Sequence, residues 1–200
     1  FSFLGSIKLK LPVTIIGYPI SMDKQGFIGD KDFLFRVLKR INGFSIVLNM
    51  DKEIVKGAKT LSTFVFRNKY DSFEQYMDTL RSGYRRRVHE ALKKLELLTI
   101  EKIDNDDFSI KDYDLYKEVF LRSRYKLELQ SMDFFKEFDG EIFQFKNSYN
   151  EPMAFVLLKE KDGFLYFIFC GFKNEDIKKY DLYYNMLLFI IREGISRRVS

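Results

Sequence analysis

The clearest pattern of hydrophobic and polar positions lies in the last third of the chain. Residues 141–146 and 152–160 are predicted as two strands, and the second meets residues 164–171 through the tight Lys161-Asp162-Gly163 turn, which is typical of a hairpin. A polar loop then leads to residues 180–193, which are apolar on most of the circumference and are therefore predicted as a buried helix. Three antiparallel strands followed by a buried helix predict a mixed α/β (α+β) fold.

The rest of the chain alternates shorter strand and helix patterns. The predicted strands are residues 6–11, 13–17, 44–50, 61–67 and 97–103. The predicted helices are residues 31–41, 72–80, 84–96, 112–127 and 132–138, with Gly83 as the joint between the second and third.

A strand–helix–glycine–strand unit occurs twice. In the first copy the helix ends at Arg40-Ile41-Asn42-Gly43, and in the second it ends at Ile191-Arg192-Glu193-Gly194. Such units are common, so the pattern is either a true repeat or chance. A true repeat predicts a strand that starts near Ile195.

Composition narrows the class of protein. The 200 residues are 46% hydrophobic and 32% charged, which indicates a globular chain and excludes a disordered one. No apolar run approaches the roughly 20 residues that a membrane-spanning helix needs, and the first 17 residues lack a signal-peptide pattern. One cysteine, Cys170, excludes an internal disulfide, and one histidine, His89, argues against a zinc site, so we expect no metal and a cytoplasmic protein. The chain starts at Phe1 and stops at Ser200 without a closing element, so we expect a piece of a longer protein.

The net charge of +5 is concentrated in one segment. Residues 81–94 hold six basic side chains against one acid, Glu90, and thus account for the whole excess. The basic residues are Arg81, Arg85, Arg86, Arg87, Lys93 and Lys94. Apolar residues at 84, 88, 91, 92 and 95 form the stripe of an amphipathic helix, so the charges are either a solvated face or a binding surface for phosphate groups. Because arginine suits bidentate contact with phosphate or carboxylate, Arg85 and Arg86 are candidate substrate-binding residues.

The order of predicted elements resembles the GNAT N-acyltransferase fold, in which two helices precede a meander of three antiparallel strands and a further helix starts beside the cofactor's pyrophosphate. The segment Phe73-Glu74-Gln75-Tyr76-Met77, followed by Leu80-Arg81-Ser82-Gly83-Tyr84-Arg85-Arg86-Arg87, is similar to a recurring segment of the FemAB-like, peptidoglycan-biosynthesis-type acyltransferases, which are tandem GNAT units. The likeness continues through Pro152-Met153-Ala154-Phe155-Val156-Leu157 and Leu165-Tyr166-Phe167 to Gly171. It implies two domains: residues 1–71 as the latter half of a preceding GNAT-like unit, and residues 72–200 as a GNAT-like acyltransferase unit that is incomplete at its C-terminus.

The resemblance implies transfer of an acyl group from acyl-CoA, such as acetyl-CoA, or of an aminoacyl group from aminoacyl-tRNA, to an amine. The acceptor would be a small-molecule amine or a cell-wall precursor, and tRNA would be a partner where it is the donor. The chain departs from the family in one respect, because residues 172–179 stand where typical GNAT enzymes have a glycine-rich pyrophosphate loop. The choice between the two donors therefore stays open.

The resemblance also implies where the cofactor binds. Transfer in this fold is direct, and backbone N–H groups at a splayed strand polarise the carbonyl, which places the cofactor beside Cys170, Gly171 and Phe172. Tyr180, at the start of the next helix, completes this cofactor-binding set. Gly171 either allows close approach of a ligand to the backbone or merely ends the strand.

Candidate proton donors and bases lie nearby in the sequence. A tyrosine usually returns the proton to the leaving group in this fold, so Tyr183 and Tyr184 are candidate catalytic residues, with core packing as the alternative for either. Asp181 is predicted as an N-terminal cap or a first-turn acid of that helix, and its charge would oppose an anion there. Glu141, Glu151 and Glu160 are candidate bases by their proximity to the sheet.

Two other functions remain open at this point. A non-catalytic polyanion- or nucleic-acid-binding module would use the basic helix at 81–94, and its affinity would fall steeply with salt. A degenerate acyltransferase half would act only as an interaction scaffold inside a longer protein.

Overall fold

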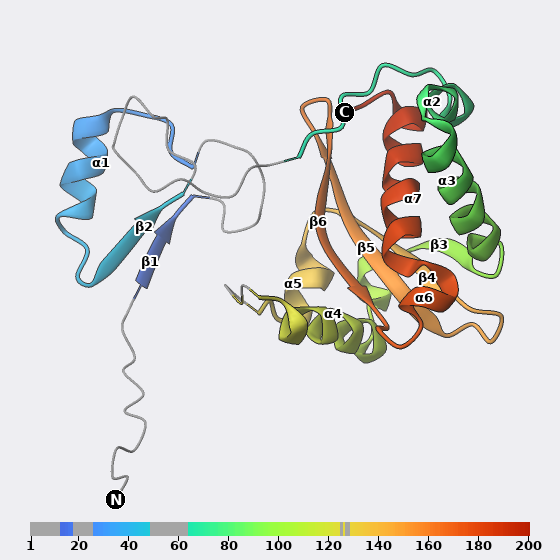
Figure 1. The fold of residues 1–200 in the computed structure, drawn as a ribbon. Helices are drawn as coiled ribbons and strands as arrows, with labels where there is room; N and C mark the ends of the chain where they lie inside the picture. The colour runs from blue at the N-terminus through green and yellow to red at the C-terminus, as the bar shows by residue number, and fades with distance from the viewer. Residues whose placement is uncertain (1–12, 18–25, 49–63, 125, 127–128) are drawn as a thin grey trace, which may run out of the picture. The chain divides into compact units, whose positions relative to one another are not determined.

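The computed structural model describes residues 13–17, 26–48, 64–124, 126 and 129–200 (Figure 1). The chain divides into two compact units, Phe1–Phe64 and Val65–Ser200. The strand predicted at 6–11 lies outside the described residues. Of the strand predicted at 61–67, residues 64–67 are described and they form no strand.

The first unit is a strand–helix–strand arrangement. Its elements are β1 (Val13–Ile16), α1 (Lys31–Leu38) and β2 (Phe44–Val47). The two strands pair in parallel, with Val13 opposite Phe44. Asp30 caps α1, since its carboxylate accepts a hydrogen bond from the backbone N–H of Phe33 at 2.7 Å. Among the described residues of this unit, Leu34 alone is buried, so these residues contribute little core.

The second unit contains a four-stranded antiparallel sheet flanked by helices. Its elements are α2 (Phe73–Thr79), α3 (Ser82–Leu95), β3 (Thr99–Ile103), a 3-10 turn (Asn105–Asp107), α4 (Ile110–Arg122), α5 (Met132–Glu137), β4 (Glu141–Lys146), β5 (Pro152–Lys161), β6 (Phe164–Phe172), α6 (Ile177–Tyr180) and α7 (Leu182–Arg197). The strand order is β3-β4-β5-β6. The predicted mixed α/β class with an antiparallel meander is therefore confirmed.

Helices cover both faces of this sheet (Figure 1). On one face, Phe143 of β4 packs against Phe189 of α7, with ring centroids 4.9 Å apart. On the other face, Phe135 of α5 meets Phe155 of β5 at 5.8 Å and Phe169 of β6 at 5.9 Å. These aromatic contacts add to the burial of apolar area that holds the layers together.

A β-bulge interrupts β6. Leu157 of β5 lies opposite Phe169, whereas its neighbour Leu158 lies opposite Phe167, so Ile168 is an extra residue in β6. Both Phe167 and Cys170 consequently pack against the apolar cluster beneath α7. The bulge thus sets which side chains of the last part of β6 face α7.

Two predictions about helix ends are wrong. No strand starts near Ile195, because α7 continues to Arg197, whose guanidinium binds Glu193 of the same helix at 2.7 Å. Gly83 is not a joint but lies inside α3, and the chain turns between α2 and α3 at Leu80 and Arg81.

The end of the chain reaches the outer edge of β6. Ser200 donates its backbone N–H to the carbonyl of Gly163 at 3.1 Å, and Leu165 donates its own to the carbonyl of Ser200 at 2.8 Å. This is the hydrogen-bond pattern of a parallel pair between Ser200 and Phe164. Each strand–helix copy is therefore followed by a parallel pairing with the copy's own strand, through four residues of β2 in the first copy and through Ser200 alone in the second.

Candidate functional site

The predicted cofactor-binding residues Cys170, Gly171 and Phe172 are the last three residues of β6. Cys170 faces the apolar cluster beneath α7, and burial raises the pKa of its thiol to about 12. The thiol therefore keeps its proton at neutral pH and is a poor nucleophile. Cys170 is therefore not placed to carry an acyl group as a thioester.

Gly171 has a packing role that the sequence did not reveal. It lies within β6 opposite Phe155, and a β-carbon here would lie 2.4 Å from the ring of Phe155 and 2.6 Å from the backbone nitrogen of Tyr116. The backbone of α4 therefore occupies the space of the missing side chain. The close approach that this glycine permits is that of a helix, which is neither of the two predicted roles, approach of a ligand or the end of the strand.

The two candidate catalytic tyrosines lie on different sides of α7. Tyr183 is 45% exposed, and its ring centroid lies 5.9 Å from that of Phe172. Burial of the hydroxyl, and then the nearby Cys170, raise the pKa of Tyr183, so it stays protonated at neutral pH. Tyr184 instead packs with α2 and α3 and lies beneath the guanidinium of Arg87 at 5.3 Å. Only Tyr183 is therefore placed at the end of β6.

Tyr180, the fourth predicted cofactor-binding residue, belongs to the core. It is 6% exposed and packs in the cluster beneath α7. Its backbone carbonyl accepts a hydrogen bond from the Asn185 side chain at 2.7 Å, and the same amide nitrogen donates to the carbonyl of Ala91 on α3 at 2.9 Å. Asn185 is fully buried, so it ties α3 to the turn between α6 and α7.

Asp181 occupies that turn but does not cap α7 with its side chain. Its backbone is left-handed, with φ of 47°, and its carboxylate pairs with Lys94 of α3 at 2.8 Å. Lys94 also donates to the carbonyl of Lys178 at 2.9 Å. Asp181 thus holds the predicted N-cap position of α7, but its side chain makes no capping hydrogen bond and its charge is paired with Lys94 of α3.

The two candidate substrate-binding arginines differ in whether their guanidinium groups are already held by contacts within the chain. Arg85 donates to the backbone carbonyls of Asp78 at 3.2 Å and Leu80 at 3.1 Å, so its guanidinium holds the C-terminal end of α2. Arg86 is 82% exposed and lies 3.8 Å from Glu90, one turn along α3. Arg86 is therefore available to a ligand, whereas Arg85 mainly positions α2 against α3.

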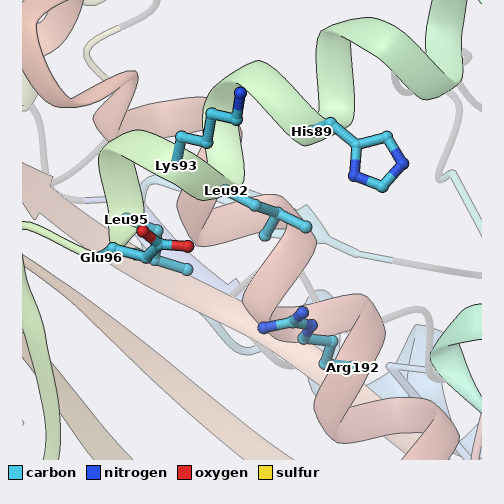
Figure 2. A pocket seen from close by; sticks show the side chains of 6 residues that line it. All are labelled: His89, Leu92, Lys93, Leu95, Glu96 and Arg192. Atoms are coloured by element: carbon cyan, nitrogen blue, oxygen red, sulfur yellow. The ribbon is translucent and has the colours of Figure 1, made fainter.

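Two adjoining open hollows lie on the exposed face of α3. The larger, of about 610 Å³, is lined by His89, Leu92, Lys93, Leu95, Glu96 and Arg192. The smaller, of about 420 Å³, is lined by Ser82, Arg85, Arg86, His89, Glu90 and Lys93. Figure 2 shows Arg192 approaching from α7, while the other labelled side chains of the larger hollow belong to α3. We call the two together the α3 groove.

The candidate bases are already paired. Burial alone would raise the pKa of Glu141, but hydrogen bonds from Lys102 and Arg197 outweigh it and lower this pKa below its ordinary value. Glu160 lies 3.4 Å from Arg197, and Glu151 accepts a hydrogen bond from the Asn147 side chain at 3.0 Å. Glu141 is therefore a weaker base than an ordinary carboxylate, and all three candidate bases already have partners within the chain.

In the part of the chain that the structure describes, no cluster of three or more histidine, cysteine or acidic side chains is arranged to hold a metal ion. None of the helices described there has the length and apolar character to cross a membrane. Comparison with protein-family models and with curated proteins gives no match for this chain.

Proposed function

We propose that residues 72–200 form a GNAT-like N-acyltransferase unit of the FemAB-like type, which transfers an acyl group from acyl-CoA, or an aminoacyl group from aminoacyl-tRNA, to an amine. The observation that carries this proposal is the arrangement around β6. Two helices, α4 and α5, precede the β4-β5-β6 meander, a bulge at Ile168 re-aims the end of β6, and α7 starts beside that end with Tyr183. Bulges are common next to active sites because they redirect the groups that follow them.

Free backbone groups along β6 support the same reaction. Within the described residues β6 is the edge strand of its sheet, and only Ser200 pairs with its outer edge. N–H groups past the bulge are therefore available to the carbonyl oxygen of a donor, where they would stabilise the negative charge that develops during attack. This contribution needs no ionised side chain.

The transfer is direct, with no covalent intermediate on the enzyme. The amine nitrogen attacks the carbonyl carbon of the donor, a C–N bond forms, and the C–S bond of a thioester or the C–O bond of an aminoacyl ester breaks. The attacking nitrogen loses one proton to solvent. Tyr183, which burial keeps protonated, gives its proton to the departing sulfur or oxygen and regains one from water.

The first unit supports a tandem organisation. Its parallel β1–α1–β2 arrangement has the same order as β6, α7 and the Ser200 segment that pairs with β6. The proposal therefore includes residues 1–71 as the latter half of a preceding GNAT-like unit.

Two measurements test the proposal. The first is thermal unfolding with excess acetyl-CoA or free CoA, and the second is an assay of thiol release with a panel of amines. A ligand at about 100 times its Kd stabilises the protein by roughly 2.7 kcal/mol, which gives a readable shift. We expect a shift that survives moderate salt, and a Tyr183→Phe variant that keeps the shift but transfers about 100-fold more slowly. The matched control, Tyr184→Phe, removes a hydroxyl from the same helix and should transfer normally. Absence of both thiol release and transfer from aminoacyl-tRNA would overturn the proposal.

A further inference from the structure

The α3 groove carries chemistry that acyl transfer at the end of β6 does not use. Its lining residues Ser82, Arg86, His89 and Lys93 follow one another at steps of three or four, so they form one line along α3. The two hollows share His89 and Lys93 and therefore adjoin each other. From Ser82 to Lys93 the line is about 16 Å long, at 1.5 Å of rise per residue.

The groove has an excess of positive charge. Its lining contains two acids, Glu90 and Glu96, and four cationic side chains, so the net charge is +2 with His89 neutral. The cationic side chains are Arg85, Arg86, Lys93 and Arg192. Within the described part of the chain, Lys93 has no ion pair, and its charge is exposed. The first turn of α3 contains no acidic residue and no side chain caps it, so the helix dipole adds positive potential at the Ser82 end.

Two apolar side chains line the larger hollow: Leu92, which is partly exposed, and Leu95, which is only 9% exposed. Leu92 is therefore the apolar surface, called the floor here, that a ligand can reach, and Figure 2 shows Arg192 approaching from α7. The guanidinium of Arg192 is already stacked on the ring of Phe73, 4.4 Å from its centroid, which holds it in place. A ligand made of phosphates alone would leave this floor unused, whereas a base would cover it and lie beside a planar cation.

We propose that the α3 groove binds a short segment of single-stranded nucleic acid. Successive phosphates lie along Arg86, His89 and Lys93, and one base covers Leu92 beside Arg192. A double helix does not fit this arrangement, because its bases are stacked inside and cannot reach the apolar floor. The site is separate from the end of β6, so the proposal does not rest on acyl transfer.

The test is the fluorescence anisotropy of a labelled octameric oligouridylate titrated with the 200-residue chain at several salt concentrations. Lys93→Glu is compared with Lys111→Glu, which makes the same change of charge at an exposed position on α4, across the sheet. We expect Lys93→Glu to weaken binding at least tenfold and to make the salt dependence shallower by roughly 0.7 per lost phosphate contact. Lys111→Glu should stay within about twofold of the unchanged chain, since a remote charge acts only through the screened net field.

A second variant tests the contact with the base separately from the contacts with the phosphates. Arg192→Ala should weaken binding of the oligouridylate more than binding of inorganic polyphosphate, measured by competition, because polyphosphate loses only one positive charge whereas the oligouridylate also loses the contact with its base. Three outcomes would each overturn the proposal. Lys93→Glu and Lys111→Glu could lose the same amount of affinity, the oligouridylate could fail to bind at low salt, or single- and double-stranded RNA could bind equally well. Thermal unfolding checks that each variant is folded. The shift in unfolding temperature with acetyl-CoA should be the same in Lys93→Glu as in the unchanged chain, so failure of the nucleic-acid proposal is distinguishable from failure of the acyltransferase proposal.

Discussion

At position 171 the backbone of α4 lies where a side chain would otherwise stand. A β-carbon there would lie 2.6 Å from the Tyr116 nitrogen and 2.8 Å from the Leu115 carbonyl carbon. Because these are backbone atoms, the steric overlap with an added β-carbon can be removed only if α4 moves away from the sheet. We expect Gly171→Ala to lower the free energy of unfolding by roughly 1–3 kcal/mol, measured by urea denaturation.

Gly83→Ala is the matched control for this prediction. Gly83 also lies in a regular element, α3, but a β-carbon there has no heavy atom within 4 Å among the described residues. Alanine favours a helix over glycine, so this change should raise the free energy of unfolding by as much as about 1 kcal/mol. If both alanine variants move stability in the same direction, the close approach of α4 is not what requires glycine at 171.

Other single residues show why the candidate site could be predicted only in part. The sequence placed two tyrosines on the last helix but could not choose between them, because a helix that is apolar all round indicates no single buried face. The structure separates them, with Tyr183 beside Phe172 and Tyr184 beneath Arg87. Arg85 was predicted to bind a ligand, yet it holds α2, because its partners are backbone carbonyls that become available only where that helix ends.

At the scale of elements, α7 is held at both ends by charge. Near its start, Asp181 pairs with Lys94 of α3. At its end, Arg197 bridges Glu193 of the same helix to Glu141 of β4, and Lys102 of β3 pairs with Glu141 at 2.5 Å. The helix beside the proposed acyl site is therefore fixed to both α3 and the sheet.

This arrangement predicts an acid-dependent loss of stability. The pKa of Glu141 is lowered in the folded chain from the ordinary value of 4.5, so its stabilising effect is complete above about pH 4.5 and disappears as pH falls through the lower, folded-state pKa. Glu141→Gln should lower the free energy of unfolding by about 1 kcal/mol at pH 7 after allowance for solvent screening. Urea denaturation from pH 7 to pH 3 should show this difference shrinking toward zero. Glu137→Gln, at an exposed position on α5, should match the unchanged chain, and a difference for Glu141→Gln that stays constant with pH would contradict the prediction.

The sequence predicted most elements of the second unit because their patterns are local. The turn at 161–163 marks the β5–β6 hairpin, and the stripe at 84, 88, 91, 92 and 95 marks α3. The strand expected near Ile195 was wrong because contacts distant in sequence, from Arg197 to Glu141 and Glu160, favour one more helical turn. The bulge at Ile168 was not foreseen, since a run of apolar residues on both faces of a strand hides a shift of one position.

At the scale of the whole molecule, the described parts of the two units differ in how much core they contain. Within residues 65–200, one apolar cluster lies between the sheet and α7 and includes Phe143, Val156 and Met186. A second lies between α2, α3 and α7 and includes Val88. In the first unit, by contrast, Phe44 is 62% exposed.

This difference predicts how fragments of the chain behave. Residues 65–200 expressed alone should unfold in one cooperative thermal transition, because both clusters consist entirely of residues within that range. Residues 1–64 alone should show no cooperative transition, because two paired strands with one helix and a single buried residue among those described bury too little apolar area to offset the loss of chain entropy. Circular dichroism of the two fragments measures both outcomes. A cooperative transition in residues 1–64, or its absence in residues 65–200, would show that the stability of the chain is not concentrated in the second unit.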